Sequence, residues 1–412
     1  MFPFRLSVGA FALALLPTAA TAASDADLAS IRSEIRELKA AYEARIEALE
    51  RRLREAESRG SAATSAAPSM PPAPASAASA FNPAISAILT GTYAHLKRDP
   101  RLFAIPGFDP GGEVGPGRRG FGIGESELVF TANVDPHFSA KLVLAVTPED
   151  TVGVEEAYGE YVGAPFGIGT RFGRFLSGIG YLNEQHAHAW DFVDAPLPYQ
   201  AFLGGRYAND GLQLKWVAPI DHFVELGAEA GNGDAYPGSE RNRNGLGSAA
   251  VFAHTGGDLG TSNSWRAGLS YLRARSEVDD GASATSRLAV ADFVWKYAPQ
   301  GNSRERAFTL QGEYFQGRIR EAARQAGWYL QGVYKFLPEW RVGLRHDRLD
   351  PRGVGDSTDE PRRSSAMVDY NPSEFSRIRL QFTRSRLQPD IADNQWFLQY
   401  ILSLGAHGAH RY

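Results

Sequence analysis

Side chains that alternate with a period of two are the strongest signal in this chain, and the pattern is clearest in the last strand-like run, 394–405. One parity of that run carries Trp396, Leu398, Tyr400, Leu402 and Leu404, and the other carries Phe397, Gln399, Ile401 and Ser403. A period of two predicts a β-strand with two distinct faces. An apolar face of this length, with aromatic residues near its ends, is typical of a barrel strand that faces lipid.

Sixteen segments of this kind follow one another from Phe81 to Tyr412, separated by clusters of turn residues. They are 84–94, 121–134, 137–147, 153–163, 167–176, 208–217, 222–231, 249–256, 263–275, 287–297, 305–317, 325–336, 339–349, 364–371, 375–386 and 394–405. Short connections such as Asp135-Pro136 alternate with long ones such as 95–120 and 177–207. This alternation predicts an all-β fold, a transmembrane antiparallel up-and-down β-barrel of about sixteen strands. An even number of strands places both ends of the barrel on the side of the short turns.

A soluble β-sandwich or β-propeller is the alternative architecture, and its outward face should be polar. The segments show the opposite, because one parity is repeatedly apolar and aromatic. Leu212, Leu214 and Trp216 alternate with Gln213 and Lys215, and Ile378, Leu380 and Phe382 alternate with Arg377, Arg379, Gln381 and Thr383. A closed barrel in lipid needs this arrangement, since its polar face lines water and its backbone hydrogen bonds leave no open edge.

Composition narrows the class of protein further. No cysteine is present, which excludes disulfides, thiol catalysis and cysteine-based metal sites. The net charge of −4 gives no general bias towards nucleic acid, so nucleic acid is not an expected partner. A mean hydropathy of −0.29 is too polar for a helical membrane protein. The 43 Gly, 23 Phe, 16 Tyr and 7 Trp suit strands with tight turns and interfacial aromatic girdles.

The N-terminal region carries a predicted targeting segment and a predicted linker. Residues 1–22 have a charged Arg5, an apolar core and an A-x-A site ending at Ala22, which predicts a cleaved secretory signal peptide. An uncleaved anchor is the alternative, although the apolar core is short for a membrane-spanning helix. Residues 61–80, rich in Ala, Ser and Pro, cannot build a core and predict an extended linker before the barrel, 81–412.

Residues 23–60 predict a coiled-coil helix in the periplasm. Apolar residues spaced by three and four form a narrow seam on a helix that is otherwise charged. The seam comprises Leu28, Ile31, Ile35, Leu38, Tyr42, Ile46, Leu49, Leu53 and Ala56. Two consecutive steps of four at Leu38–Tyr42–Ile46 form a stutter that locally unwinds the supercoil. A lone helix packed on the barrel is the alternative.

The polar faces of the predicted strands carry unevenly distributed charges, with basic residues concentrated in the last four strands. The candidate pore-lining residues for selectivity are Lys215, Arg266, Lys335, Arg341, Arg345, Arg377 and Arg379, and the acids include Glu127, Glu225, Glu229, Asp292 and Glu313. Opposed charges across an aqueous pore create a transverse field, and arginine binds phosphate and carboxylate oxygens well. The alternative is that these charges pair across the lumen and only stiffen it.

The connection 177–207 is long and apolar, and it contains Trp190, Phe192 and Tyr199 as possible anchors. A loop of this content is expected to fold into the barrel and form a constriction. Packing over the barrel mouth or against a neighbouring subunit is the alternative. The candidate constriction residues are Glu184, His186, His188, Trp190 and Asp191.

Two pairs of histidines stand close together in the sequence. His186 and His188 lie beside Glu184 in the loop, and His407 and His410 lie near the C-terminus. Imidazole and carboxylate groups together bind zinc, so His186 and His188 are candidate metal ligands. Two ligands constrain a site only weakly, and an ordinary polar surface is the alternative. In the expected topology the two pairs lie too far apart to bind the same metal ion.

The motifs of common catalytic sites are missing from the sequence. It contains no G-x-S-x-G elbow, no H-E-x-x-H and no P-loop. The prediction is therefore a protein that is not an enzyme, with no catalytic residues and no cofactor. A hydrolase with its nucleophile on a barrel face is the enzymatic alternative.

The order of these features resembles the phosphate-selective porin group of Gram-negative outer-membrane channels. The likeness rests on FNPAISAILTGTY, IGTRFGRFLSGIGYLNEQHAHAWDF and LGAHGAHRY, the last closing on an aromatic residue like the assembly signal of outer-membrane barrels. The resemblance implies a barrel of sixteen or eighteen strands, a trimer and a pore narrowed by an inward loop. Phosphate-selective members line that constriction with lysines, whereas 177–207 has no lysine and only Arg206. The chain is therefore similar to a distinct branch of the group.

Together these features predict an outer-membrane porin. It is expected to conduct small hydrophilic solutes passively, including anions such as phosphate, through a loop-constricted aqueous pore. Expected partners are outer-membrane lipid, further copies of the chain in a homotrimer, small anionic or neutral solutes, and peptidoglycan. The alternatives are a loop-plugged barrel that anchors the outer membrane to the cell wall, and a channel for metal ions.

Overall fold

The computed structural model describes residues 83–405, apart from 112–113, 148–150, 238, 240–243, 278–282, 321–322, 353–359 and 389–390. The predicted signal peptide, coiled-coil helix and linker lie outside the described residues, as do His407 and His410. The described residues all belong to one compact unit, Ser76–Tyr412.

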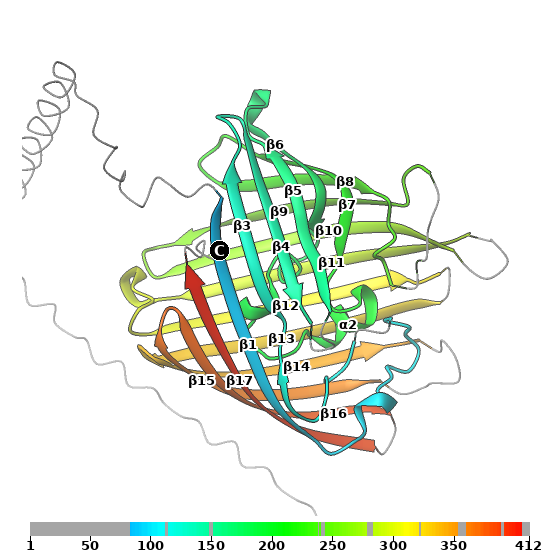
Figure 1. The fold of residues 1–412 in the computed structure, drawn as a ribbon, viewed down its shortest axis with the longest axis vertical. Helices are drawn as coiled ribbons and strands as arrows, with labels where there is room; N and C mark the ends of the chain where they lie inside the picture. The colour runs from blue at the N-terminus through cyan, green and yellow to red at the C-terminus, as the bar shows by residue number, and fades with distance from the viewer. Residues whose placement is uncertain are drawn as a thin grey trace, which may run out of the picture. The chain divides into compact units, whose positions relative to one another are not determined.

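The described chain is a single antiparallel sheet that closes into a barrel (Figure 1). Its strands are β1 (Ala84–Leu96), β2 (Gly120–Ile123), β3 (Ser126–Asn133), β4 (Phe138–Val146), β5 (Val152–Tyr161), β6 (Ile168–Leu176), β7 (Ala208–Val217), β8 (Phe223–Gly231), β9 (Ser248–Leu259), β10 (Asn263–Glu277), β11 (Ser283–Tyr297), β12 (Ala307–Arg318), β13 (Arg324–Leu337), β14 (Trp340–Asp350), β15 (Arg362–Ser373), β16 (Ser376–Gln388) and β17 (Ile391–Gly405). β2 and β3 both pair with β1, so together they fill one place in a barrel of sixteen strands. The predicted fold class is therefore confirmed.

The single predicted strand 121–134 is broken after Ile123 and resumes at Ser126. Side-chain and backbone groups bridge the break, because the Thr90 N–H donates to Ser126 Oγ at 3.0 Å and the Gly124 N–H donates to Thr90 O at 2.8 Å. The hydrogen-bonded ladder to β1 therefore continues although the strand is interrupted.

The barrel closes between its first and last strands. Ser86 at the start of β1 lies opposite Gly405 at the end of β17, and the two strands stay in register as far as Leu96 and Gln395. Both ends of the barrel therefore lie on the same side, as the even number of strands predicts. Closure leaves neither strand with an open edge.

The two predicted faces of the strands are present. On β17, Leu398 and Tyr400 are 46% and 49% exposed, whereas Phe397 and Gln399 on the other parity are 3% and 7% exposed. The same outward exposure holds for Leu212 on β7. An apolar outer surface around a closed barrel matches acyl chains rather than water, since each strand pairs with a neighbour on both sides.

Helices are a minor part of the fold. In the part of the chain that the structure describes, the 3₁₀ helices are η1 (Pro100–Leu102), η2 (Pro165–Gly167), η3 (Ala187–Ala189) and η5 (Pro299–Gly301), and the α-helix is α2 (Leu197–Leu203). α2 has a proline in its first turn and ends at Gly204, whose φ of 66° is left-handed. Among the described residues, no helix is both long enough and apolar enough to cross a membrane.

Candidate functional site

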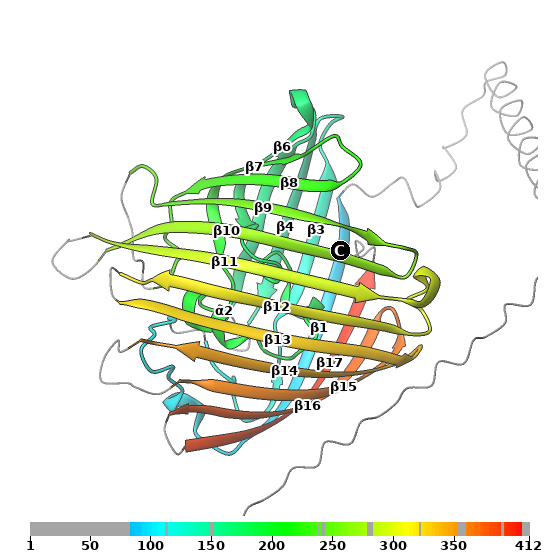
Figure 2. The ribbon, with the colours of Figure 1, turned by 180° about the vertical axis from the view of Figure 1, so that it is seen from behind.

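The loop 177–207, here called the inward loop, connects β6 to β7 and runs inside the barrel. α2 packs against β12, β13 and β14, and both views draw it within the ring of strands (Figures 1 and 2). All seven residues of α2 are buried. The inward loop and the adjoining wall share one apolar cluster that includes Ile179, Leu182, Trp190, Leu197, Tyr199, Phe202, Tyr207, Leu288, Phe315 and Tyr329. The loop therefore folds inward, as its apolar content predicts.

Two lumen glutamates fasten the start of the inward loop. Glu313 on β12 accepts hydrogen bonds from the backbone N–H groups of Tyr181 and Leu182, both at 3.1 Å. It also accepts the hydroxyls of Tyr199 and Tyr329, at 2.9 Å and 2.6 Å. These acids were expected to contribute to the field of the pore, but the carboxylate of Glu313 serves instead as an acceptor for loop donors that would otherwise be buried without partners.

The second glutamate, Glu229 on β8, binds the loop at its first two residues. It accepts from Ser177 Oγ at 2.6 Å and from the Gly178 N–H at 2.8 Å. Gln213 on β7 donates to the same carboxylate at 2.7 Å. The first residues of the inward loop are therefore bound to two separate places on the wall.

Strands β14–β16 carry Arg341, Arg345, Arg363, Arg377 and Arg379 and are here called the basic wall. The middle of the inward loop is bound to this basic wall through two aspartates. Asp191 Oδ1 lies 2.9 Å from Arg341 Nη1. Asp194 lies 2.9 Å from Arg345 Nη2 and 2.7 Å from Arg363 Nη1. Burial alone would raise the pKa of Asp194, but the two guanidinium groups outweigh it and hold this pKa below its usual range.

The remaining two predicted arginines, Arg377 and Arg379, share one aspartate of the wall itself, Asp369. Arg379 Nε lies 2.8 Å from Asp369 Oδ1, and Arg377 Nε lies 3.9 Å from the same carboxylate. Arg377 also donates to the backbone carbonyl of Trp190 at 3.3 Å. The structure thus brings Arg341, Arg345, Arg377 and Arg379 together on one wall, each beside a carboxylate, which matches the pairing alternative.

Lys215, Arg266 and Lys335 lie apart from that group. Lys215 forms an ion pair with Glu184 of the inward loop. The guanidinium of Arg266 lies over the ring of Tyr181, 5.2 Å from its centre. Lys335 donates to backbone carbonyls of the turn between β11 and β12, so it is at the end of the barrel rather than beside the inward loop.

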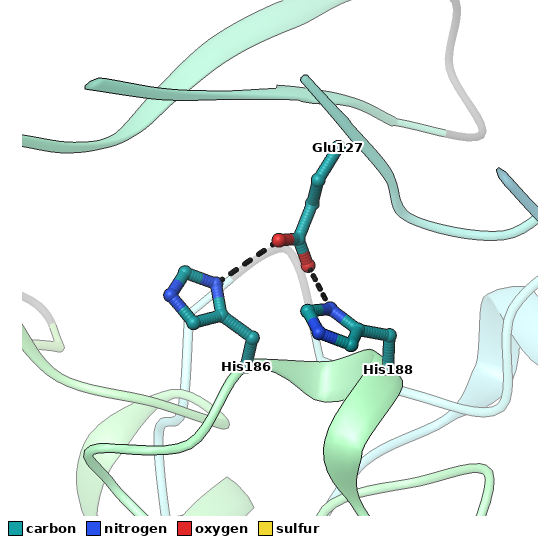
Figure 3. Close-up of side chains that lie close together, drawn as sticks. All are labelled: Glu127, His186 and His188. Atoms are coloured by element: carbon teal, nitrogen blue, oxygen red, sulfur yellow. Dashed lines mark hydrogen bonds and ion pairs between the residues drawn. The ribbon is translucent and has the colours of Figure 1, made fainter. Parts of the chain in front are cut away.

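The two candidate metal ligands, His186 and His188, meet carboxylates on a different part of the wall, formed by β3 and β5 (Figure 3). His188 Nδ1 lies 2.7 Å from Glu127 Oε1 on β3, and His186 Nδ1 lies 3.2 Å from Glu127 Oε2. His186 Nδ1 also lies 3.0 Å from Glu155, and its Nε2 lies 2.8 Å from Glu156. Burial would lower the pKa of His186, but hydrogen bonds to Glu127 and Glu156 raise it to about 9.

A β-bulge explains how two consecutive glutamates reach the same histidine. In the register of β4 with β5, Val143 lies opposite Glu156 and Leu144 lies opposite Val154, which leaves Glu155 as the extra residue. A bulge breaks the strict alternation of side chains and can re-aim one of them. Sequence analysis missed Glu155 and Glu156 for this reason, and the adjacent Glu-Glu pair within a predicted strand was the available signal.

Two cations complete this group of charges. Lys141 on β4 pairs with Glu156 at 2.5 Å, and Arg206 at the end of the inward loop pairs with both Glu125 and Glu155. The inward loop is therefore bound to an acidic wall at its histidines and to a basic wall at its aspartates.

Comparison with known proteins agrees with this architecture. The channel DcaP of Acinetobacter baumannii matches with a TM-score of 0.52 at 12% identity, over 78% of this chain and 96% of that one. An anion-selective porin from Comamonas acidovorans matches with a TM-score of 0.51 at 10% identity, over 78% and 98%. The trimer form of OmpT from Vibrio cholerae matches with a TM-score of 0.50 at 11% identity, over 77% and 98%. The chain therefore shares the β-barrel fold of these outer-membrane proteins.

No family model matches the chain. A protein of Aquifex aeolicus (strain VF5), described as an uncharacterized protein, is 30% identical over 385 residues, which covers 80% of each chain. The chain belongs to the same family as this Aquifex protein. The expected membership of a porin group is borne out at the level of fold, and the phosphate-selective subtype stays a prediction.

Proposed function

We propose that this protein is an outer-membrane channel that lets small hydrophilic solutes cross passively through the lumen of the barrel. The observation that carries the proposal is the inward loop, which is bound to separate parts of the wall of a barrel whose outer face is apolar. A loop fixed in this way narrows the lumen without the need for a moving part. Such transport involves no chemical step, so the proposal does not include an enzymatic activity.

The proposed selectivity is a modest preference for anions, with phosphate among them. Five arginines on the basic wall share four carboxylates. They are Arg341, Arg345, Arg363, Arg377 and Arg379, with Asp191, Asp194, Asp347 and Asp369. One positive charge remains in excess, and Arg377 has the longest of these ion pairs, at 3.9 Å. An excess of this size supports weak attraction of anions, not a strong filter.

The proposal also includes the assembly and the place of the protein in the cell. The trimer form of the fold neighbour OmpT and the outward apolar face support a homotrimer in the outer membrane. The predicted coiled coil would then lie in the periplasm, where it can hold the subunits together or reach peptidoglycan. Cross-linking of the mature protein in membranes should give a ladder that ends at three subunits.

Current through a planar lipid bilayer tests the proposed function. Purified protein that is folded in detergent should insert and give stepwise currents of uniform size. In a salt gradient, the sign of the reversal potential should then show that anions cross more readily than cations. A barrel that is folded and inserted but never conducts would overturn the proposal.

A loop-plugged anchor is the second candidate, and the large apolar cluster between the inward loop and the wall favours it. The two candidates differ in what happens when 187–203 is replaced by a short Gly-Ser linker. A channel conducts before the replacement and conducts more after it. A plugged barrel is silent before the replacement and conducts only after it.

A further inference from the structure

The group of Glu127, His186 and His188 has the composition of a metal centre, and Glu155 lies at its edge, 3.0 Å from His186 Nδ1. We propose that it binds one divalent transition-metal ion, zinc by its ligand chemistry, and that the bound ion cross-links the inward loop to β3 and β5. This goes beyond the proposed channel, because an ion can bind here whether or not the barrel conducts.

The donor atoms lie near the separations that a small ion needs. One donor atom each from Glu127, His186 and His188 lies within 4.8 Å of the others. His186 Nδ1 is 3.2 Å from Glu127 Oε2 and 3.0 Å from Glu155 Oε2. Bonds of about 2.0–2.1 Å in a tetrahedron place ligand atoms about 3.3–3.4 Å apart. The two pairs at His186 Nδ1 need to change by only a few tenths of an ångström, and the set as a whole, within 4.8 Å, has to draw together around the ion.

Glu156 is placed as a positioning residue for His186. It lies 2.8 Å from Nε2 of that ring, on the side opposite to the nitrogen that faces Glu127 and Glu155. Ligand histidines in metal sites commonly donate their second N–H to a carboxylate, which fixes the tautomer and the ring orientation. Lys141 in turn pairs with Glu156 and holds it in place.

The balance of charge in the group also fits a dication. The four carboxylates are Glu125, Glu127, Glu155 and Glu156, and the two permanent cations paired with them are Lys141 and Arg206. A histidine that ligates a metal ion is neutral, so binding releases the proton that His186 holds in the ion-free site, and two negative charges then remain. One divalent ion neutralises them, and its two imidazole ligands remain neutral.

The donor types identify the class of ion. Two imidazole nitrogens with carboxylate oxygens suit zinc and its transition-metal neighbours. Calcium and magnesium prefer sites made only of oxygen. The candidate probe is therefore Zn²⁺, with Ca²⁺ and Mg²⁺ as ions that should not compete.

Calorimetric titration with Zn²⁺ tests the proposal on the mature protein in detergent. The protein should carry no polyhistidine tag and should have His407→Ala and His410→Ala, so that the C-terminal histidines cannot bind. One Zn²⁺ should bind per chain. His186→Ala and the near-isosteric Glu127→Gln should each weaken binding at least 100-fold, and Glu156→Gln should weaken it 10–100-fold.

His254→Ala is the matched control, since His254 is also buried and its Nδ1 lies 2.9 Å from Glu225. This variant should bind zinc as the parent does. Circular dichroism and heat-modified gel mobility confirm that each variant is folded. No heat of binding in the folded parent, or equal binding by the His186→Ala and His254→Ala variants, would overturn the proposal.

A second readout follows the inward loop itself. Zinc should slow the cleavage of this loop by a protease added in detergent, and EDTA should reverse the effect. The protection should be lost in Glu127→Gln and kept in His254→Ala. Protection that is the same in both variants would assign the zinc to another place and contradict the cross-link.

Discussion

Asp194 Oδ1 on the inward loop lies 2.9 Å from Arg345 Nη2 on β14, although the two residues are far apart in the sequence. Arg345 is almost completely buried, and a second guanidinium, that of Arg363, lies 2.7 Å from the same carboxylate. Two buried cations on one anion make this contact the firmest charged link between the inward loop and the basic wall. The position of the loop therefore depends on the charge of Asp194.

Replacing that carboxylate should release the loop. Asp194→Asn leaves Arg345 and Arg363 buried with one charge fewer between them, which we expect to cost about 3–5 kcal/mol. Protease cleavage within 177–207 and larger current fluctuations in bilayers would report the release. Asp350→Asn, at an exposed pair with Arg352, is the control that should leave both unchanged.

The same contact predicts a dependence on pH. The pKa of Asp194 is lowered from its ordinary value of 3.8 in the folded protein, so its stabilising effect is present above that value and is lost as the pH falls through the lowered pKa. The stability difference between wild type and Asp194→Asn should therefore shrink in acid. A difference that stays constant from neutral to strongly acidic pH would contradict this assignment.

Glu313 should be among the residues on which the stability of the barrel interior depends most. Glu313→Gln replaces one acceptor oxygen by an NH₂ group that faces the donors of Tyr181, Leu182, Tyr199 and Tyr329. We expect a loss of about 2–3 kcal/mol in the free energy of unfolding, because buried donors lose their partner. Urea titration in lipid vesicles measures it, with the exposed turn variant Glu339→Gln as control. An unchanged midpoint for Glu313→Gln would show that the loop is held elsewhere.

Arg377 should carry most of the proposed preference for anions. Its pair with Asp369 is long, at 3.9 Å, whereas the other arginines of this wall lie closer to their carboxylates. Arg377→Glu should shift the reversal potential in a salt gradient towards cations, and Arg348→Glu, outside this group, should not. The shift should shrink at high salt because of screening. An unchanged reversal potential in Arg377→Glu would show that the selectivity arises in another part of the lumen.

The apolar outer face should tolerate charge poorly. Leu398 lies in the middle of β17, opposite Leu380 and Tyr93, and is exposed on the outside of the barrel. Leu398→Arg should cost about 2–4 kcal/mol of stability in a bilayer if this position is near the midplane. Thr309→Arg, at a lumen-side position, should cost less. Equal costs would argue against a lipid-facing outer surface.

The barrel could be predicted from the sequence because period-two patterning is imposed separately on every strand. Lipid outside and polar groups inside constrain each strand alone, so segments such as 208–217 agree with the observed β7 (Ala208–Val217). The break after Ile123 and the bulge at Glu155 escaped this reasoning, because both depend on hydrogen bonding with a neighbouring strand.

The candidate site was only partly predictable for a related reason. The histidines and the inward direction of the loop could be inferred from the loop's own composition. Their partners could not, since Glu127 precedes His188 by 61 residues and Glu313 follows Leu182 by 131. Closure of the barrel alone brings these groups together. Pairing of the arginines with Asp191 and Asp194 likewise became apparent only from the three-dimensional arrangement.

Single-cysteine labelling during bilayer recording tests most directly whether the lumen holds water and the outer face meets lipid. The chain has no cysteine of its own, so one can be placed at a time. The neighbours Arg377 and Ile378 occupy opposite faces of β16, and Ile378 is 47% exposed on the outside. A membrane-impermeant charged thiol reagent should reduce the current through Arg377→Cys and leave Ile378→Cys unaffected. Reduction at Ile378→Cys with none at Arg377→Cys would contradict the account.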